Sequence, residues 1–100
     1  MITVEMNDDT MVVRLAGDID HHTAGEIRRY IDERAQIMKP LVLKMDFAAV
    51  PFMDSSGIGL VIGRYNSIKP YGGTIVIENT GNQIKKVMRL AGLDRLAVIK

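Results

Sequence analysis

The chain has 100 residues, of which 47% are hydrophobic and 25% are charged, so one small folded domain is expected and a disordered chain is excluded. The net charge is +1 at pH 7, and no strongly basic surface is therefore expected that would recruit nucleic acid or an anionic membrane. Cysteine is absent, which excludes a disulfide framework, a thiol nucleophile and a cysteine-ligated metal.

The first segments alternate between apolar and polar residues and predict a β-hairpin. Residues 2–6 have the alternation of an amphipathic strand at the edge of a sheet. Residues 7–9 are a hairpin turn signal, and the apolar run at residues 11–16 predicts the second strand. Residues 17–20 then interrupt this strand and lead into a helix.

A first helix is expected after this loop. Either Asp20 caps it, or Thr23 does so together with Glu26, which has the spacing of a capping box. The segment 39–40 ends the helix, because the residue before a proline is pushed out of the α region. The predicted inner face consists of Ala24, Ile27, Ile31, Ala35 and Met38, and the predicted solvent face of Arg28, Arg29, Asp32, Glu33 and Arg34.

The middle of the chain predicts a central strand and a second helix. Residues 41–45 form a mostly continuous apolar run, which suits a strand covered on at least one face. The helix extends to about Lys69 and is followed by a turn at residues 70–73. Its apolar residues recur at steps of three and four and are Ile58, Val61, Ile62, Tyr65 and Ile68.

The last third predicts a strand, a short helix and a final strand. Residues 74–78 are β-branched and strand-like, and residues 96–99 form the last apolar run. Thr80 and Gln83 have capping-box spacing and predict the start of the third helix, and Gly92 stands where a left-handed C-cap belongs. The predicted inner face of this helix consists of Ile84, Val87, Met88 and Ala91.

The element order is therefore β-β-α-β-α-β-α-β. This order predicts an α/β fold with a small mixed sheet of about five strands, parallel where helices cross over, and with helices mainly on one face. The N-terminus lacks a basic segment followed by an apolar core, and no apolar run approaches the roughly 20 residues that span a bilayer. A cytoplasmic location is therefore expected.

Residues 51–62 are the segment around which function is expected to be organised. Asp54 or Ser55 is the natural N-cap of the second helix, because either side chain can accept from the free amides of the first turn. Gly57 and Gly59 destabilise that turn, and close approach by a strand or by another protein is the simplest compensation. A hydroxyl is thus presented at a positively polarised helix start.

Two segments resemble the signature segments of the STAS-domain anti-sigma factor antagonists: residues 17–24 (Gly-Asp-Ile-Asp-His-His-Thr-Ala) and residues 52–59 (Phe-Met-Asp-Ser-Ser-Gly-Ile-Gly). Gly63-Arg64-Tyr65 and the Gly72-Gly73 turn resemble the sporulation branch, the antagonists of the sigma-F anti-sigma factor. The resemblance extends over the whole chain and implies a single STAS domain at residues 1–100. Family members usually carry a further C-terminal helix after the last strand, whereas this sequence ends at Lys100.

The resemblance implies a partner-switching protein that is not an enzyme. In that family the unmodified antagonist binds an anti-sigma factor that is also a serine kinase, and so frees the sigma factor. The kinase uses ATP and magnesium to phosphorylate the serine directly after the motif aspartate, here Ser55, and a PP2C-type phosphatase removes the phosphate. The ATP and magnesium belong to the partner, and no cofactor is expected for this chain. The expected partner-binding residues are Asp20, Asp54, Ser55, Ser56, Gly57 and Ile58.

Other interpretations of these residues stay open. One alternative assigns Ser55 and Ser56 to helix capping alone, whereas the resemblance favours Ser55 as phosphoacceptor and Ser56 as a structural hydroxyl. The adjacent pair His21-His22 points in directions about 100° apart on a helix and lacks further ligands, so metal binding is not expected. Asp18 and Asp20 are better explained by a turn and a cap than by paired catalytic carboxylates.

Three alternatives for the whole protein follow. The first is a STAS scaffold that is never phosphorylated and assembles with other STAS domains. The second is a small serine hydrolase, which is disfavoured because neither Ser55 nor Ser56 lies in a Gly-x-Ser-x-Gly elbow. The third is a nucleotide-binding protein, which no phosphate-binding loop supports.

Arg64 lies on the second predicted helix. It is expected to be either a charged residue at the rim of the partner interface or an ordinary charged residue in contact with solvent.

Overall fold

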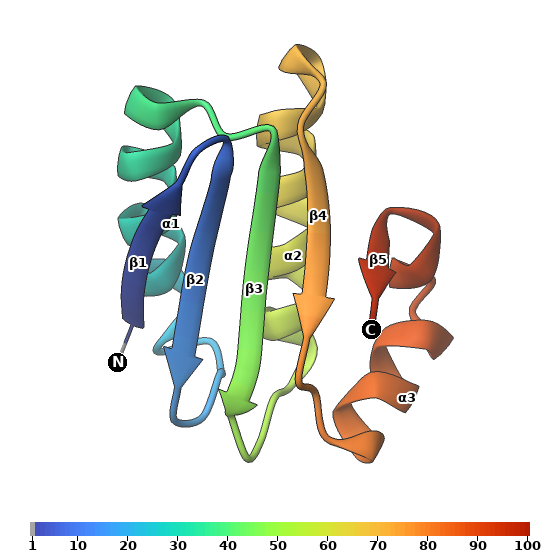
Figure 1. Ribbon diagram of the computed structural model, residues 1–100. Coiled ribbons are helices and arrows are strands. Elements are labelled where there is room, and N and C mark those ends of the chain that lie inside the picture. Colours follow the sequence, from blue (N-terminus) through green and yellow to red (C-terminus); the bar gives the residue numbers. More distant parts are fainter. Residues whose placement is uncertain (1) are drawn as a thin grey trace.

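The computed structural model describes residues 2–100 and shows a mixed sheet with strand order β1-β2-β3-β4-β5 (Figure 1). β1 is antiparallel to β2, and each later pair of neighbouring strands is parallel. The strands are β1 (Ile2–Asn7), β2 (Thr10–Ala16), β3 (Val42–Ala49), β4 (Thr74–Glu78) and β5 (Ala97–Ile99). The helices are α1 (Ala24–Met38), α2 (Ser55–Ile68) and α3 (Asn82–Leu90), with short 3₁₀ turns at Lys69–Tyr71 and Leu93–Arg95.

Most of the core lies between one face of the sheet and the helices α1 and α2, which both pass behind the sheet in Figure 1, and Ile84 and Met88 of α3 extend it. α3 lies beside the β4–β5 edge. The strand residues that point into this core are buried and alternate along each strand: Met11, Val13, Leu15, Leu43, Met45, Phe47, Ile75 and Ile77. The element order, the mixed five-stranded sheet and the placement of helices mainly on one face are therefore as predicted.

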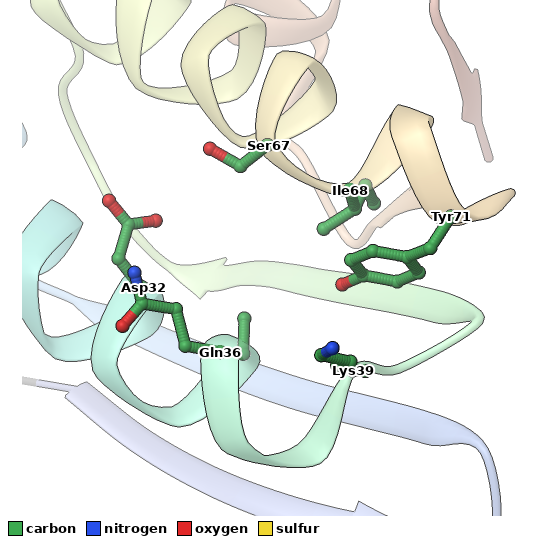
Figure 2. A pocket seen from close by; sticks show the side chains of 7 residues that line it. Asp32, Gln36, Lys39, Ser67, Ile68 and Tyr71 are labelled. Carbon is green, nitrogen blue, oxygen red and sulfur yellow. The ribbon is translucent and has the colours of Figure 1, made fainter.

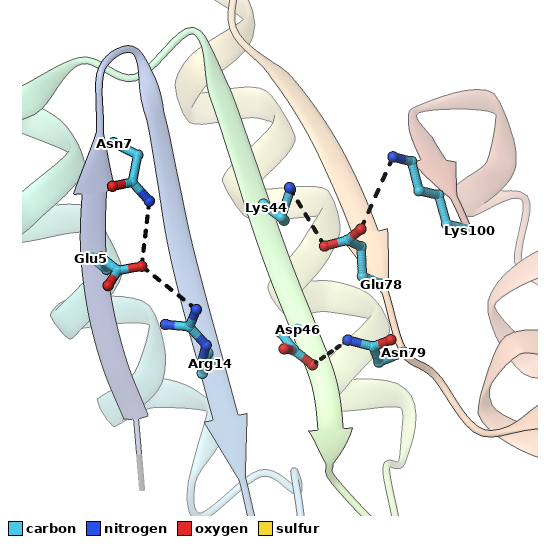
Figure 3. Close-up of polar contacts among 8 residues, drawn as sticks. All are labelled: Glu5, Asn7, Arg14, Lys44, Asp46, Glu78, Asn79 and Lys100. Atoms are coloured by element: carbon cyan, nitrogen blue, oxygen red, sulfur yellow. Dashed lines mark hydrogen bonds and ion pairs between the residues drawn. The ribbon is translucent and has the colours of Figure 1, made fainter.

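The other face of the sheet carries charged residues and valines, and no helix lies over it in Figure 1. The pairing of the strands aligns Glu5, Val12, Lys44, Val76 and Val98 in one row across the sheet. Figure 3 shows ion pairs on this face, among them Lys44 with Glu78 at 3.6 Å. Pairs on a surface of this kind, partly or fully open to solvent, contribute about 0–1 kcal/mol each, so they add little to stability.

Several local predictions are confirmed by the chain geometry. β4 has the predicted bounds, and α1 ends at Met38, followed by Lys39 in a left-handed conformation. Gly92 has φ +82° directly after Ala91, the C-cap residue of α3, and so has the predicted left-handed conformation at the end of the helix. β3 extends to Ala49, four residues beyond the predicted end, because Phe47 continues the buried alternation.

The start of α3 was predicted wrongly. The helix begins at Asn82 with Gly81 as its N-cap and no side-chain cap hydrogen bond. Thr80 therefore lies one residue before the cap, and its hydroxyl is buried without a hydrogen-bond partner among the described residues. The physical reason is the turn at Asn79, whose φ of +61° redirects the chain before the helix can form.

The inner faces of two helices are narrower than predicted. Met38 is 53% exposed at the last residue of α1, where the helix has passed the end of the sheet. Val87 and Ala91 are also exposed, because α3 packs at the sheet edge and buries only the stripe around Ile84 and Met88. None of the helices in the described part of the chain is long and apolar enough to cross a membrane.

Candidate functional site

Asp54 fixes the start of α2, which resolves the choice between Asp54 and Ser55 as N-cap. Its backbone is extended (φ −97°, ψ −167°), and its Oδ1 accepts the backbone N–H of Ser56 at 2.8 Å. The backbone carbonyl of Asp54 accepts the N–H of Gly57 at 3.0 Å. Ser55 is therefore the first helical residue, and its side chain is free of the capping role.

A short parallel bridge joins the two signature segments. The N–H of Ile19 donates to the carbonyl of Phe52 at 3.0 Å, and the N–H of Asp54 donates to the carbonyl of Ile19 at 3.1 Å. Ile19 is only 1% exposed, so this bridge is anchored in the core. It holds the loop that contains Asp20 alongside the residues that directly precede Ser55.

The loop around Asp20 has its own hydrogen-bonded structure. Asp20 Oδ1 accepts the backbone N–H groups of His22 and Thr23 at 2.9 and 3.1 Å. Thr23 Oγ1 in turn accepts the N–H of Asp20 at 3.0 Å. This reciprocal pair has the bonding pattern of a capping box and closes the turn that precedes α1. Thr23 is the N-cap residue of α1 but makes no side-chain cap hydrogen bond, so the Thr23–Glu26 alternative is not formed. The hydrogen bonds from Thr23 and then His22 lower the pKa of Asp20.

The predicted site residues differ in their exposure. Ser55 is exposed, and its hydroxyl has no hydrogen-bond partner within the described residues. Asp54 and Ser56 are half-buried, and Ile58 is half-buried and packs against the core. Gly57 is buried against the side chain of Met53, which a Cβ on Gly57 would overlap. The structure thus brings these residues and the Asp20 loop to one end of the molecule, while their roles in partner binding stay predictions.

Two opposing electrostatic effects act on a negative charge at the Ser55 hydroxyl. The helix dipole favours a negative charge at this position by roughly 0.3–1 kcal/mol in exposed settings, although the first-turn N–H groups of Ser56 and Gly57 are already bonded to Asp54. The Asp54 carboxylate opposes such a charge. The histidine rings of His21 and His22 lie against each other, with centroids 3.9 Å apart. No group of three or more His, Cys, Asp or Glu side chains within residues 2–100 could hold a metal ion.

Arg64 contradicts the prediction of a rim or solvated charge. The residue is 5% exposed, and its Nε lies 2.8 Å from Oδ1 of Asp32 on α1. Asp32 was likewise predicted to face solvent, yet its side chain is only one-third exposed. The pair joins the two helices behind the sheet. Its signal in the sequence is the position of Arg64, three residues after Val61 and four before Ile68, which places it on the buried face.

Two hollows flank this ion pair along the seam between α1 and α2. One, of about 320 Å³, lies at the end far from Ser55, with Asp32, Gln36 and Lys39 on one wall and Ser67, Ile68 and Tyr71 on the other (Figure 2). Burial raises the pKa of Tyr71 there. The other, of about 440 Å³, is lined by Ser56 and Arg64 and lies at the Ser55 end.

The family model of the STAS domain matches residues 1–100. The chain belongs to the STAS-domain family. It is 31% identical over 98 residues to the anti-sigma F factor antagonist of Paenibacillus polymyxa, and the aligned region covers 98% of this chain and 84% of the relative. The anti-sigma F factor antagonist of Lysinibacillus sphaericus is 36% identical over 87 residues, or 85% of this chain and 73% of the relative.

Solved structures of the anti-sigma factor antagonist SpoIIAA resemble this STAS domain over 100% of its length. The unphosphorylated form has a TM-score of 0.80 at 29% identity, with 87% of that chain covered. The phosphorylated form, described as a Bacillus cell fate determinant, has a TM-score of 0.78 at 31% identity, with 91% covered. The resemblance to the sporulation branch is thus confirmed, and SpoIIAA itself exists in both phosphorylation states.

Proposed function

We propose that this STAS domain is an anti-sigma factor antagonist whose binding is switched by phosphorylation of Ser55. The observation that carries the proposal is the Ser55 hydroxyl, exposed on the first residue of α2, where the Asp54 cap and the Ile19–Met53 bridge hold the helix start in place. The names of its relatives and the two forms of SpoIIAA support the same function.

In this proposal the unphosphorylated domain binds an anti-sigma factor that is also a serine kinase, and thereby releases the sigma factor. The kinase supplies ATP and magnesium. Ser55 Oγ bonds to the γ-phosphorus while the bond from this phosphorus to ADP breaks, and the hydroxyl proton passes to a base of the kinase. A PP2C-type phosphatase then hydrolyses the phosphate ester and restores the hydroxyl. The STAS domain is a substrate and a ligand in this cycle, acts in the cytoplasm, and needs no cofactor of its own.

The phosphate acts on the partner rather than on the fold. It adds about −1.5 to −2 charges and three strong acceptors at the helix start. The helix dipole favours this charge and Asp54 opposes it, so the two effects on stability roughly cancel. A fitted partner surface, by contrast, must accommodate a bulky dianion. The proposed docking surface consists of Asp20, Asp54, Ser55, Ser56 and Ile58. Gly57, which was also expected to bind the partner, is buried against Met53 and shapes the helix start from inside.

The test is phosphoryl transfer from labelled ATP by a cognate anti-sigma kinase to three proteins: the unmodified domain, Ser55→Ala and Ser56→Ala. Ser56 is the matched control, because it is the neighbouring hydroxyl and is half-buried. We expect label on the unmodified domain and on Ser56→Ala, and none on Ser55→Ala. Label that persists in Ser55→Ala would overturn the assignment, and an unlabelled wild type would favour the scaffold alternative.

A further inference from the structure

A groove of about 440 Å³ lies between α1 and α2 at the Ser55 end of the molecule. The residues that matter for its chemistry are Gly25 and Arg28 of α1 and Ser56, Gly59, Gly63 and Arg64 of α2. Ser56 directly follows the proposed phosphoacceptor, so the groove is continuous with the proposed docking surface. Its lining includes two guanidinium groups and no carboxylate.

The positive charge of Arg64 is incompletely balanced within the domain. The residue is 95% buried, and its Nη1 has no hydrogen-bond acceptor within the described residues. Its one carboxylate partner, Asp32, is itself one-third exposed. Burial lowers the pKa of Arg64, Asp32 raises it, and the nearby positive charge of Arg28 lowers it again. A buried donor without an acceptor is unfavourable, and an acceptor supplied from outside would relieve it.

The glycines of the groove have no explanation inside the domain. A Cβ on Gly25, Gly59 or Gly63 would meet no atom within 4 Å, whereas a Cβ on Gly57 would overlap Met53. Glycine within a helix is less stable than alanine, so three such residues facing one groove destabilise both helices. What they provide is access, because a partner can approach the helix backbone closely where no side chain stands.

We propose that this groove receives an acidic segment of the anti-sigma partner, with a carboxylate of that segment between Arg28 and Arg64 and its backbone against the glycines. The inference rests on the proposed function and adds a second contact region to it. Charge complementarity favours this occupant: the groove is cationic, and a carboxylate matches the fork of a guanidinium. Contacts of this kind strengthen binding and make it sensitive to ionic strength.

The test measures the affinity of the cognate anti-sigma kinase for the full chain and four variants by isothermal titration calorimetry at low and high salt. Arg28→Glu reverses a charge of the groove, and Arg29→Glu is its control, an exposed arginine on the same helix outside the groove. Gly59→Gln fills the groove, and Asn66→Gln is its control on an exposed position of α2. Melting temperatures are measured in parallel.

We expect Arg28→Glu to weaken binding at least about tenfold and to reduce its salt dependence, with Arg29→Glu within about twofold of wild type. We expect Gly59→Gln to weaken binding while its melting temperature stays equal or rises, a combination that a purely structural glycine would not produce. If the wild type binds the kinase and the variants Arg28→Glu and Gly59→Gln bind it with the same affinity, the inference about the groove is overturned and the proposed function is not. Absence of wild-type binding would overturn the proposed function as well. A stabilisation by inorganic phosphate that depends on Arg28, with unchanged partner affinity, would make the groove a free-anion site instead.

Discussion

The packing of Gly57 against Met53 offers a sharp test of how the signature loop is held. Gly57 lies in the first turn of α2, and a Cβ there would overlap both Cγ and Sδ of Met53. Met53 is 8% exposed and is the bridge partner of Ile19. The substitution Gly57→Ala therefore forces the Met53 side chain to move within the core, or the helix start to shift.

The magnitude follows from two opposing effects. Overpacking of a core by one methyl group destabilises typically by about 1–3 kcal/mol. Replacing a helical glycine by alanine recovers about 0.5–1 kcal/mol. We therefore expect Gly57→Ala to lower the free energy of unfolding by about 1 kcal/mol, which corresponds to a fall in melting temperature of roughly 4–8 °C for a domain of this size.

The matched control is Gly59→Ala, two residues further along the same helix. A Cβ on Gly59 meets no atom within 4 Å, so only the gain in helix stability remains. We expect it to raise the free energy of unfolding by about 0.5–1 kcal/mol. Both variants are measured by urea and thermal unfolding with circular dichroism. A Gly57→Ala domain as stable as Gly59→Ala would refute the packing argument.

Three further predictions concern polar groups. Asp32→Asn leaves the Arg64 guanidinium buried without its carboxylate, so urea unfolding should show that the free energy of unfolding falls by about 1–3 kcal/mol. The control Glu33→Gln, at an exposed position, should leave it almost unchanged. Equal effects of the two variants would contradict a stabilising role of the Asp32–Arg64 pair. The pKa of Asp20 is lowered in the folded state, so the ionised Asp20 carboxylate stabilises the fold above about pH 4, and this stabilisation is lost as the pH falls through the folded-state pKa. The difference in the free energy of unfolding between wild type and Asp20→Asn should therefore shrink below about pH 4. A difference that grew there would refute the direction of the pKa shift. Phosphorylation of Ser55 should change the free energy of unfolding by less than about 1 kcal/mol in a circular-dichroism melt, because the dipole of α2 and the Asp54 carboxylate act on the phosphate in opposite directions. A phosphorylated domain that had lost most of its free energy of unfolding would contradict this prediction.

Features set by neighbouring residues could be predicted from the sequence. The alternation of buried residues in β4, the proline after Lys39 and the left-handed glycine at Gly92 are each determined within a few residues. The N-cap of α2 could be narrowed to Asp54 or Ser55 by the same local chemistry, and only the hydrogen bond to Ser56 distinguished them. The prediction that Ser55 is the phosphoacceptor came from the family resemblance, because capping chemistry alone does not support it.

Features set by contacts between distant segments could not be predicted. Asp32 and Arg64 lie on different helices, and their burial depends on how α1 and α2 pack on the sheet. The bridge between Ile19 and Met53 likewise joins residues that no local pattern relates. The error at Thr80 has a different origin, because the left-handed turn at Asn79 moves the helix start to Asn82, with Gly81 as an N-cap that has no side chain to form a capping box.

The central claim is that a phosphate on Ser55 controls binding of the anti-sigma partner. The most direct measurement is the affinity of a cognate anti-sigma factor for the unphosphorylated domain and for the same domain phosphorylated on Ser55, compared by calorimetry at one salt concentration. We predict binding by the unphosphorylated form and a loss of at least about tenfold, or about 1.4 kcal/mol, on phosphorylation. Equal affinities of the two forms would contradict the account.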